Sequence, residues 1–135
     1  MKLAIKCAAL GISRKQTPFG ACIVKNNKIV SIAHNTVFKT TDITAHAEIN
    51  AIRLACKKLK SVDLTGCVIY STCEPCPMCF AACHWAKISG IVYGLSINDA
   101  RRAGFNELTI SNAKMKKYGD SPVCVRKGVL VRENL

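Results

Sequence analysis

Two short segments, well separated in the chain, carry the residues that most restrict how it can fold. The first is His46-Ala47-Glu48, and the second is Pro75-Cys76-Pro77-Met78-Cys79. An imidazole and two thiolates are good Zn²⁺ ligands, and three protein ligands leave one tetrahedral position open for water. Each segment starts a predicted helix, and a helix N-terminus favours thiolates because its dipole lowers the cysteine pKa. The sequence therefore predicts a fold that brings the first turns of two helices together around one zinc ion.

Glu48 stands two residues after the predicted ligand His46. It is close enough to reach a water molecule on the metal, whose pKa a bound zinc lowers to about 7. A carboxylate in that place can accept and return protons, so we expect Glu48 to be catalytic and not a ligand. A lone histidine near a helix start is usually a surface or capping residue, and a lone Cys-x-x-Cys can be redox-active or structural. Their combination with Glu48 and with a proline before Cys76 favours the catalytic interpretation.

The cysteines leave one alternative from a different class of protein. Of the nine cysteines, Cys73, Cys76, Cys79 and Cys83 have the C-x2-C-x2-C-x3-C spacing of an iron–sulfur ligand run. No second run follows, and an iron–sulfur cluster would leave His46-Ala47-Glu48 without a purpose. We therefore expect Cys73 and Cys83 to be reduced, non-ligating thiols, with a non-catalytic zinc or iron–sulfur module as the alternative. An odd cysteine number and no recognisable signal peptide favour a reducing, cytoplasmic compartment.

Length and charge set the remaining limits. A chain of 135 residues predicts a single domain, residues 1–135, and no apolar stretch is long enough to cross a membrane. The net charge is +12, with lysine clusters at 57–60 and 114–117. Such a charge fits either a solvated lysine-rich surface or attraction to a polyanion such as nucleic acid. The clusters contain no interleaved aromatic residues, which weakens the nucleic-acid interpretation.

Apolar periodicity predicts an α/β fold. We expect helices over 1–12, 45–59, 74–87, 98–103 and 108–118, and strands over 21–25, 28–33, 67–71 and 88–93. The first two strands form a hairpin across Asn26-Asn27, and residues 123–131 form a last strand or hairpin. A hairpin followed by strands alternating with helices indicates a mixed sheet of about five strands with helices on both faces.

Residues 18 to about 107 resemble the cytidine deaminase superfamily of zinc-dependent nucleobase deaminases, and within it the bacterial and plant guanine and guanosine deaminases. The zinc motif is specific for the superfamily. The segment 103–107 is the main pointer to the guanine branch, although the family's Gly-Phe-Asp-Asp is Gly-Phe-Asn-Glu here. The matching segments are Pro18-Phe19-Gly20-Ala21, His34-Asn35, Thr44-Ala45-His46-Ala47-Glu48, Ala51-Ile52-Arg53, Ser71-Thr72-Cys73-Glu74-Pro75-Cys76-Pro77-Met78-Cys79, Trp85-Ala86, Tyr93-Gly94 and Ala103-Gly104-Phe105.

The resemblance implies a three-layer α/β/α sandwich, one zinc ion per chain on His46, Cys76 and Cys79, and Glu48 as the proton shuttle. It also implies a homodimer, in which the guanine deaminases cover the partner's active site with a C-terminal tail longer than residues 121–135 here. The substrate-binding residues that it implies are Asn35 on the base edge, Ala47, Trp85 near the pocket, and Glu107 in place of a substrate-contacting aspartate.

The resemblance thus implies hydrolytic deamination of a small-molecule nucleobase, with guanine plus water giving xanthine and ammonia as the leading reaction. Adenosine in tRNA is the first alternative, because tRNA adenosine deaminases share the zinc motif and a charge of +12 suits RNA. Cytosine or cytidine is the second alternative substrate.

Overall fold

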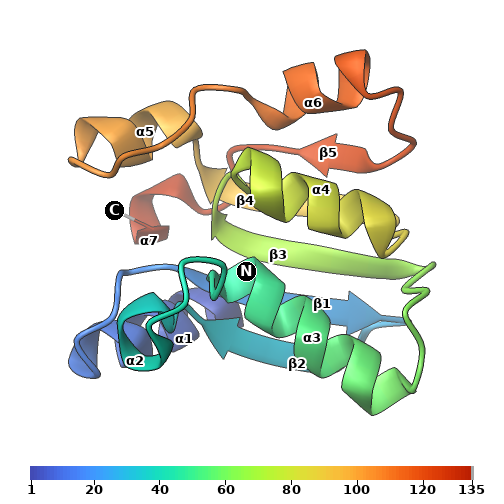
Figure 1. Ribbon diagram of the computed structural model, residues 1–135, viewed down its shortest axis with the longest axis horizontal. Helices are drawn as coiled ribbons and strands as arrows, with labels where there is room; N and C mark the ends of the chain where they lie inside the picture. The colour runs from blue at the N-terminus through green and yellow to red at the C-terminus, as the bar shows by residue number, and fades with distance from the viewer. Residues whose placement is uncertain (135) are drawn as a thin grey trace.

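The computed structural model describes residues 1–134 and shows one mixed five-stranded sheet with the strand order β2-β1-β3-β4-β5 (Figure 1). Strand β1 is antiparallel to both of its neighbours, β2 and β3, whereas β3, β4 and β5 are parallel to one another. The strands are β1 (Gly20–Lys25), β2 (Lys28–His34), β3 (Cys67–Cys73), β4 (Gly90–Leu95) and β5 (Cys124–Arg126).

Helices cover both faces of this sheet. Helices α3 and α4 lie side by side over one face (Figure 1). The helices are α1 (Lys2–Ser13), α2 (Val37–Thr40), α3 (Ala47–Leu59), α4 (Pro77–Trp85), α5 (Ile97–Arg102), α6 (Asn112–Tyr118) and α7 (Val131–Asn134). None of the helices within residues 1–134 is both long and apolar enough to span a membrane.

Strand β1 shows why the two faces carry different helices. A Cβ atom on Gly20 would clash with the Ala4 carbonyl oxygen, so only glycine lets α1 pack this closely. The next residue, Ala21, belongs to the buried core together with Ala47 and Ala51 of α3. Because successive residues of a strand face opposite sides, α1 and α3 lie on opposite faces. The predicted α/β/α sandwich is therefore confirmed.

Most element boundaries lie close to the predicted ones; the short helix α2 was not predicted, and the other differences fall near the C-terminal end. Asn26 and Asn27 adopt φ values of 49° and 59°, as the predicted tight hairpin turn requires. The helix predicted over 108–118 begins only at Asn112, because residues 105–108 line a cavity instead of forming a helical turn. Of the last strand or hairpin predicted over 123–131, the structure shows the single strand β5, followed by the short helix α7.

The topology brings helix N-termini together at the carboxyl ends of the parallel strands. Strands β3 and β4 are parallel, so their carboxyl ends meet there, and α4 begins four residues after the end of β3. The N-terminus of α3 lies at the same edge (Figure 1). Polar groups at the carboxyl ends of parallel strands commonly form binding sites.

Candidate active site

The three predicted ligands converge where α3 and α4 begin. His46 Nδ1 lies 3.7 Å from Cys76 Sγ and 3.6 Å from Cys79 Sγ. Bonds of about 2.3 Å to sulfur and about 2.0 Å to nitrogen at the tetrahedral angle place such atoms about 3.6 Å apart. The donor atoms all lie within 4.8 Å of one another. His46, Cys76 and Cys79 therefore fit a zinc ion.

Two of the ligands occupy a special helix position. His46 is the N-cap of α3 and Cys76 is the N-cap of α4, and neither side chain caps its helix. An N-cap side chain usually accepts a hydrogen bond from the first turn. Here both side chains turn toward each other instead, which leaves the donor atoms free for a metal. The sequence predicted that His46 and Cys76 lie in the first turns, one residue after the N-cap positions that they occupy.

Hydrogen bonding between the ligands separates their proton affinities. A hydrogen bond from the Cys79 thiol, with a further contribution from His46, lowers the pKa of Cys76 to about 4. Donation to Cys76, together with burial, raises the pKa of Cys79. The hydrogen bond with Cys76 also raises the pKa of His46. One thiolate is thus ready for a metal at neutral pH, and a metal would displace the remaining protons.

Glu48 lies beside the ligands in the first turn of α3, with only 5% of its surface exposed. Its Oε1 accepts a 2.7 Å hydrogen bond from the Ser71 hydroxyl, and its Oε2 lies 3.6 Å from Cys79 Sγ. Burial raises the pKa of Glu48, and the hydrogen bond from Ser71 opposes that shift. A buried carboxyl group with a raised pKa is suited to exchange protons near neutral pH.

The ligands open onto a cavity of about 460 Å³. Phe19 and Phe105 stand at its wall with ring centroids 4.8 Å apart in an edge-to-face arrangement. Ten of the seventeen lining residues are apolar, aromatic or cysteine, and seven polar side chains lie among them. The residues of the lining that bear on the argument are Asn35, His46, Glu48, Cys76, Phe105 and Glu107.

The side chain of Asn35 has a defined orientation in this cavity. Asn35 is 4% exposed, and its Oδ1 accepts a 3.0 Å hydrogen bond from the Val37 backbone N–H. Because a backbone N–H can only donate, the amide oxygen must face Val37. The amide NH₂ group is left as the donor that can meet an acceptor on a ligand.

Glu107, which the resemblance implied as a substrate-binding residue, reaches the same cavity from the segment that follows α5. Gly104 adopts a φ of 95°, which directs the chain after α5 back toward the cavity. Glu107 is half-buried, and burial raises the pKa of its carboxyl group. The structure thus brings Glu107 to the cavity that Glu48 and Glu74 also line.

Two predicted substrate-binding residues lie elsewhere. Trp85 is at the far end of α4 from Cys76, about 13 Å away at 1.5 Å per residue. Its side chain is 81% exposed, and its ring contacts His84. Ala47 is fully buried in the core and does not line the cavity. The structure of the single chain therefore does not bring Trp85 or Ala47 to the cavity.

The other two cysteines of the closely spaced run stay apart from the ligands. The Cys73 thiol donates to the Ser96 carbonyl at 3.6 Å, and Cys83 is buried in the hydrophobic core. Burial raises the pKa of both thiols. Within residues 1–134, the histidines, cysteines and acidic residues form a metal-sized group only at His46, Cys76 and Cys79. A four-cysteine cluster is therefore not assembled.

Two supporting residues were missed in the sequence. Ser71 holds Glu48, as described above. Glu74 is 6% exposed and accepts from the backbone N–H groups of Ile97 and Asn112 at 3.1 and 2.8 Å. It thereby joins the segment that carries Cys76 to the starts of α5 and α6. The signal that could have identified Ser71 is a polar residue at a buried position of a strand.

An α/β sandwich with three metal ligands at helix N-termini and a buried carboxyl group beside them is the architecture of a zinc-dependent hydrolase. Residues 1–95 match the family described as the cytidine and deoxycytidylate deaminase zinc-binding region. The chain belongs to this family, and its zinc-binding deaminase domain could hold zinc on His46, Cys76 and Cys79.

Individual relatives point to two different substrates. The chain is 43% identical over 108 residues to a guanine deaminase of Bacillus subtilis, covering 79% of this chain and 69% of that protein. It is 41% identical over 93 residues to a tRNA-specific adenosine deaminase of Aquifex aeolicus, covering 69% of this chain and 62% of that protein. A solved structure from work on A-to-I editing by tRNA:A34 deaminases superposes with a TM-score of 0.83 at 30% identity, covering 99% and 94% of the two chains.

Proposed function

We propose that this chain, as one deaminase domain, converts guanine and water to xanthine and ammonia. The presence of Glu107 in the cavity with Asn35 and Glu48 is the observation that carries this choice of base. Guanine has ring N–H groups that can donate hydrogen bonds to a carboxylate, whereas the ring nitrogens N1 and N3 of adenine are acceptors. The similarity to a guanine deaminase supports the same choice.

Recognition of the base is divided between two side chains in this proposal. The NH₂ group of Asn35 donates to an acceptor on the purine, and the carboxylate of Glu107 accepts from ring N–H groups. Phe19 and Phe105 close the apolar wall, which excludes water and strengthens these polar contacts. Adenine in the same orientation would leave buried polar groups unpaired, at about 1–3 kcal/mol each.

Proton transfer is the task of Glu48. Zinc, when bound by His46, Cys76 and Cys79, supplies a Lewis acid that makes water a nucleophile near neutral pH. Glu48 takes a proton from the attacking water and delivers protons to the ring nitrogen and to the departing amine. The water oxygen forms a bond to C2 of guanine, the bond from C2 to its amine breaks, and ammonia leaves. Ser71 holds the carboxyl group in place through these transfers.

Adenosine in a tRNA anticodon loop is the second candidate substrate. The net charge of +12 favours an RNA polyanion. The match over 94% of a chain from work on tRNA:A34 deaminases also supports this candidate. In this alternative, the zinc site and Glu48 act as before, and the basic surface supplies most of the affinity for the phosphate backbone.

The experiment that decides is the measurement of kcat/KM for guanine, adenine, cytosine, cytidine and a tRNA anticodon stem-loop with the same zinc-loaded preparation. We expect guanine to react faster than adenine by about 10²-fold or more, because a site built to pair polar groups rejects a base that leaves them unpaired. Glu107→Gln should lower kcat/KM for guanine with little change in Tm. Deamination of the stem-loop adenosine without turnover of free guanine would overturn the proposal and establish the second candidate.

A further inference from the structure

The loop of residues 35–45, which includes the short helix α2, runs from β2 to α3 and connects Asn35 with the metal ligand His46. Asn35 opens this loop, and the ligand His46 follows directly after its last residue, Ala45. Val37, Phe38 and Ile43 of the same loop line the cavity. The shape of the loop therefore sets where the Asn35 amide stands relative to the metal ligand.

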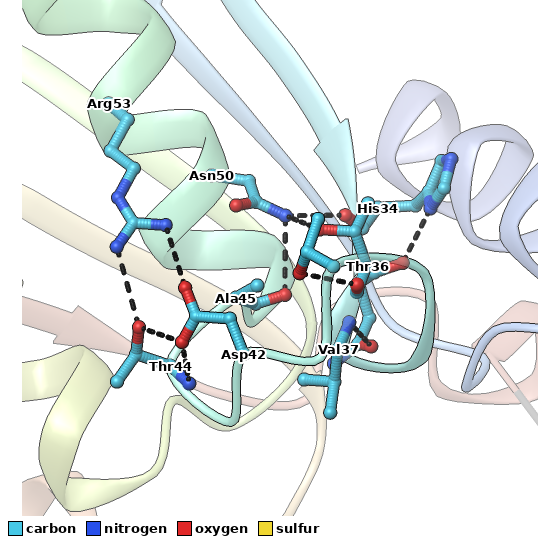
Figure 2. A network of polar contacts seen from close by, with 10 residues as sticks. His34, Thr36, Val37, Asp42, Thr44, Ala45, Asn50 and Arg53 are labelled. Carbon is cyan, nitrogen blue, oxygen red and sulfur yellow. Dashed lines mark hydrogen bonds and ion pairs between the residues drawn. The ribbon is translucent and has the colours of Figure 1, made fainter.

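A single side chain ties the two ends of this loop together (Figure 2). Asn50 lies on α3, one turn after His46, and its Nδ2 donates to the Ala45 carbonyl at 3.2 Å. The same nitrogen lies 3.1 Å from the His34 carbonyl oxygen and 2.9 Å from Thr36 Oγ1 at the other end of the loop. One backbone hydrogen bond, from Thr36 N–H to the Ala45 carbonyl at 3.0 Å, closes the loop beside it.

His46 depends on this arrangement because little else orients it. A metal-ligating histidine usually donates its second ring N–H to a carboxylate or a carbonyl, which holds the ring. Within residues 1–134, the hydrogen bonds of the His46 ring run only to the thiols of Cys76 and Cys79. The ring direction is consequently set by the backbone at the N-cap of α3. Asn50 holds that backbone through Ala45, together with the backbone hydrogen bonds from His46 N–H to Thr44 and from Thr36 N–H to Ala45.

The rest of the polar network in Figure 2 does not replace this tie. Asp42 Oδ1 accepts from the Thr44 N–H and hydroxyl at 2.9 and 2.6 Å, and Arg53 pairs with Asp42 at 3.8 Å. These groups are half-buried or exposed; Asp42 and Thr44 lie in the second half of the loop, and Arg53 lies on α3. The Asp42 backbone N–H also donates to the Val37 carbonyl at 3.2 Å, but none of these side chains contacts the Asn35 end of the loop.

We propose that Asn50 is a positioning residue that keeps His46 and Asn35 in register, so that one amide affects both zinc affinity and base binding. The effect on zinc affinity follows from the ligand geometry alone. The effect on base binding rests on the proposed function of Asn35. Asn50 acts through the backbone and does not touch the metal or the base.

The decisive variant is Asn50→Leu, which keeps a similar volume and removes the donors. We expect zinc affinity in the full chain, measured by competition with a chromophoric chelator, to fall about 10–100-fold, the range for lost outer-shell partners. In the zinc-saturated variant we expect KM for guanine to rise more than kcat falls, since Asn35 shifts while Glu48 stays bound to Ser71.

Ser31→Ala is the matched control. The Ser31 hydroxyl is buried and donates to the Ala51 carbonyl at 2.8 Å, so it also joins β2 to α3, but it does not contact the loop. We expect a fall in Tm comparable to that of Asn50→Leu and an unchanged zinc affinity. Asn50→Leu binding zinc within about threefold of the parent, or Ser31→Ala losing as much affinity, would overturn the proposal.

Asn50→Gln keeps the test informative if Asn50→Leu does not fold. It retains the amide but displaces it by one methylene, so we expect a fall in zinc affinity of about tenfold. Unchanged zinc affinity in a folded Asn50→Gln protein would count against the proposal. A parent chain that binds zinc yet deaminates none of the bases would sink the proposed function, while the comparison of zinc affinities would still decide the role of Asn50.

Discussion

The pKa values of single residues at this site are shifted by their surroundings. Burial raises the pKa of Glu48, whereas the hydrogen bond from Cys79 lowers the pKa of Cys76 to about 4. A buried carboxyl group with a raised pKa and a thiolate with a lowered pKa therefore lie in the same site. The helix N-terminus predicted a lowered pKa for both cysteine ligands, but the structure lowers that of Cys76 alone, because Cys79 donates to Cys76 and is buried.

Glu48→Gln tests the proton-transfer role at unchanged side-chain volume. The amide oxygen can still accept from Ser71, so fold and zinc content should be retained, while turnover should fall at least about 10²–10⁴-fold. Initial rates with the best base, together with metal analysis, provide the measurement. Turnover within about tenfold of the parent would refute the assignment of Glu48.

Substitution of the four closely spaced cysteines tests the ligand set. Cys76→Ala and Cys79→Ala should lose zinc, because each variant retains only two of the three ligands. Cys73→Ala and Cys83→Ala should keep one zinc per chain, since neither thiol belongs to the metal-sized group. Zinc per chain is measured by elemental analysis after dialysis. Loss of zinc from Cys73→Ala or Cys83→Ala would mean that the site is a cysteine cluster.

Among the elements, α5 matters because the chain leaves it directly for the cavity wall. Its N-cap Ser96 accepts from Asp99 N–H, and the Asp99 carboxylate accepts in return from Ser96 N–H at 2.9 Å. Glu74 also accepts from Ile97 N–H at 3.1 Å. The start of α5 is thus held by its own capping box and by Glu74, in the segment that carries Cys76. These hydrogen bonds help to hold Phe105 and Glu107 in place.

The capping box of α5 predicts a pH-dependent stability. Hydrogen bonds from Ser96 hold the pKa of Asp99 below its ordinary value, so its contribution to stability is present above that value and lost as the pH falls through the lower folded pKa. Asp99→Ala should therefore lower Tm at pH 7, and the difference should shrink below about pH 4. Thermal unfolding of both proteins across this pH range checks the expectation.

Arg102→Ala separates capping from charge pairing in that experiment. Arg102 pairs with Asp99 at 3.8 Å on an exposed surface, where such pairs contribute little. We expect its Tm to stay close to that of the parent at every pH. A Tm difference for Asp99→Ala that does not change with pH, or an equal effect of Arg102→Ala, would contradict the capping explanation.

For the whole molecule, the exposed apolar side chains favour self-association. Trp85 is 81% exposed, Tyr118 78%, Ile43 76% and Phe38 67%, and Phe38 and Ile43 also line the cavity. An exposed apolar patch commonly marks an interface, and Phe38 and Ile43 present such side chains together at the cavity. We predict a dimer that completes the cavity wall, so light scattering at micromolar concentration should give at least twice the 14.7 kDa of the chain. A monomer with full activity would contradict this prediction.

The sequence by itself determined the features that neighbouring residues control. Cys76 and Cys79 are three residues apart, so one helical turn brings both thiols to one side, and Asn26-Asn27 can adopt the positive φ angles of a tight turn. The order of hairpin, helices and alternating strands likewise sufficed for the mixed five-stranded sheet, because periodicity and turn chemistry act over short distances.

Only the tertiary structure decided what depends on residues distant in the chain. Phe19 meets Phe105, Ser71 holds Glu48, and Asn50 ties His34 to Ala45 because the packing of the sheet and the helices brings them together. The same packing leaves Trp85 in solvent, although its position in the motif suggested the pocket. Burial, hydrogen-bond partners and pKa shifts arise from three-dimensional surroundings, whereas a motif specifies only the residues that enter them.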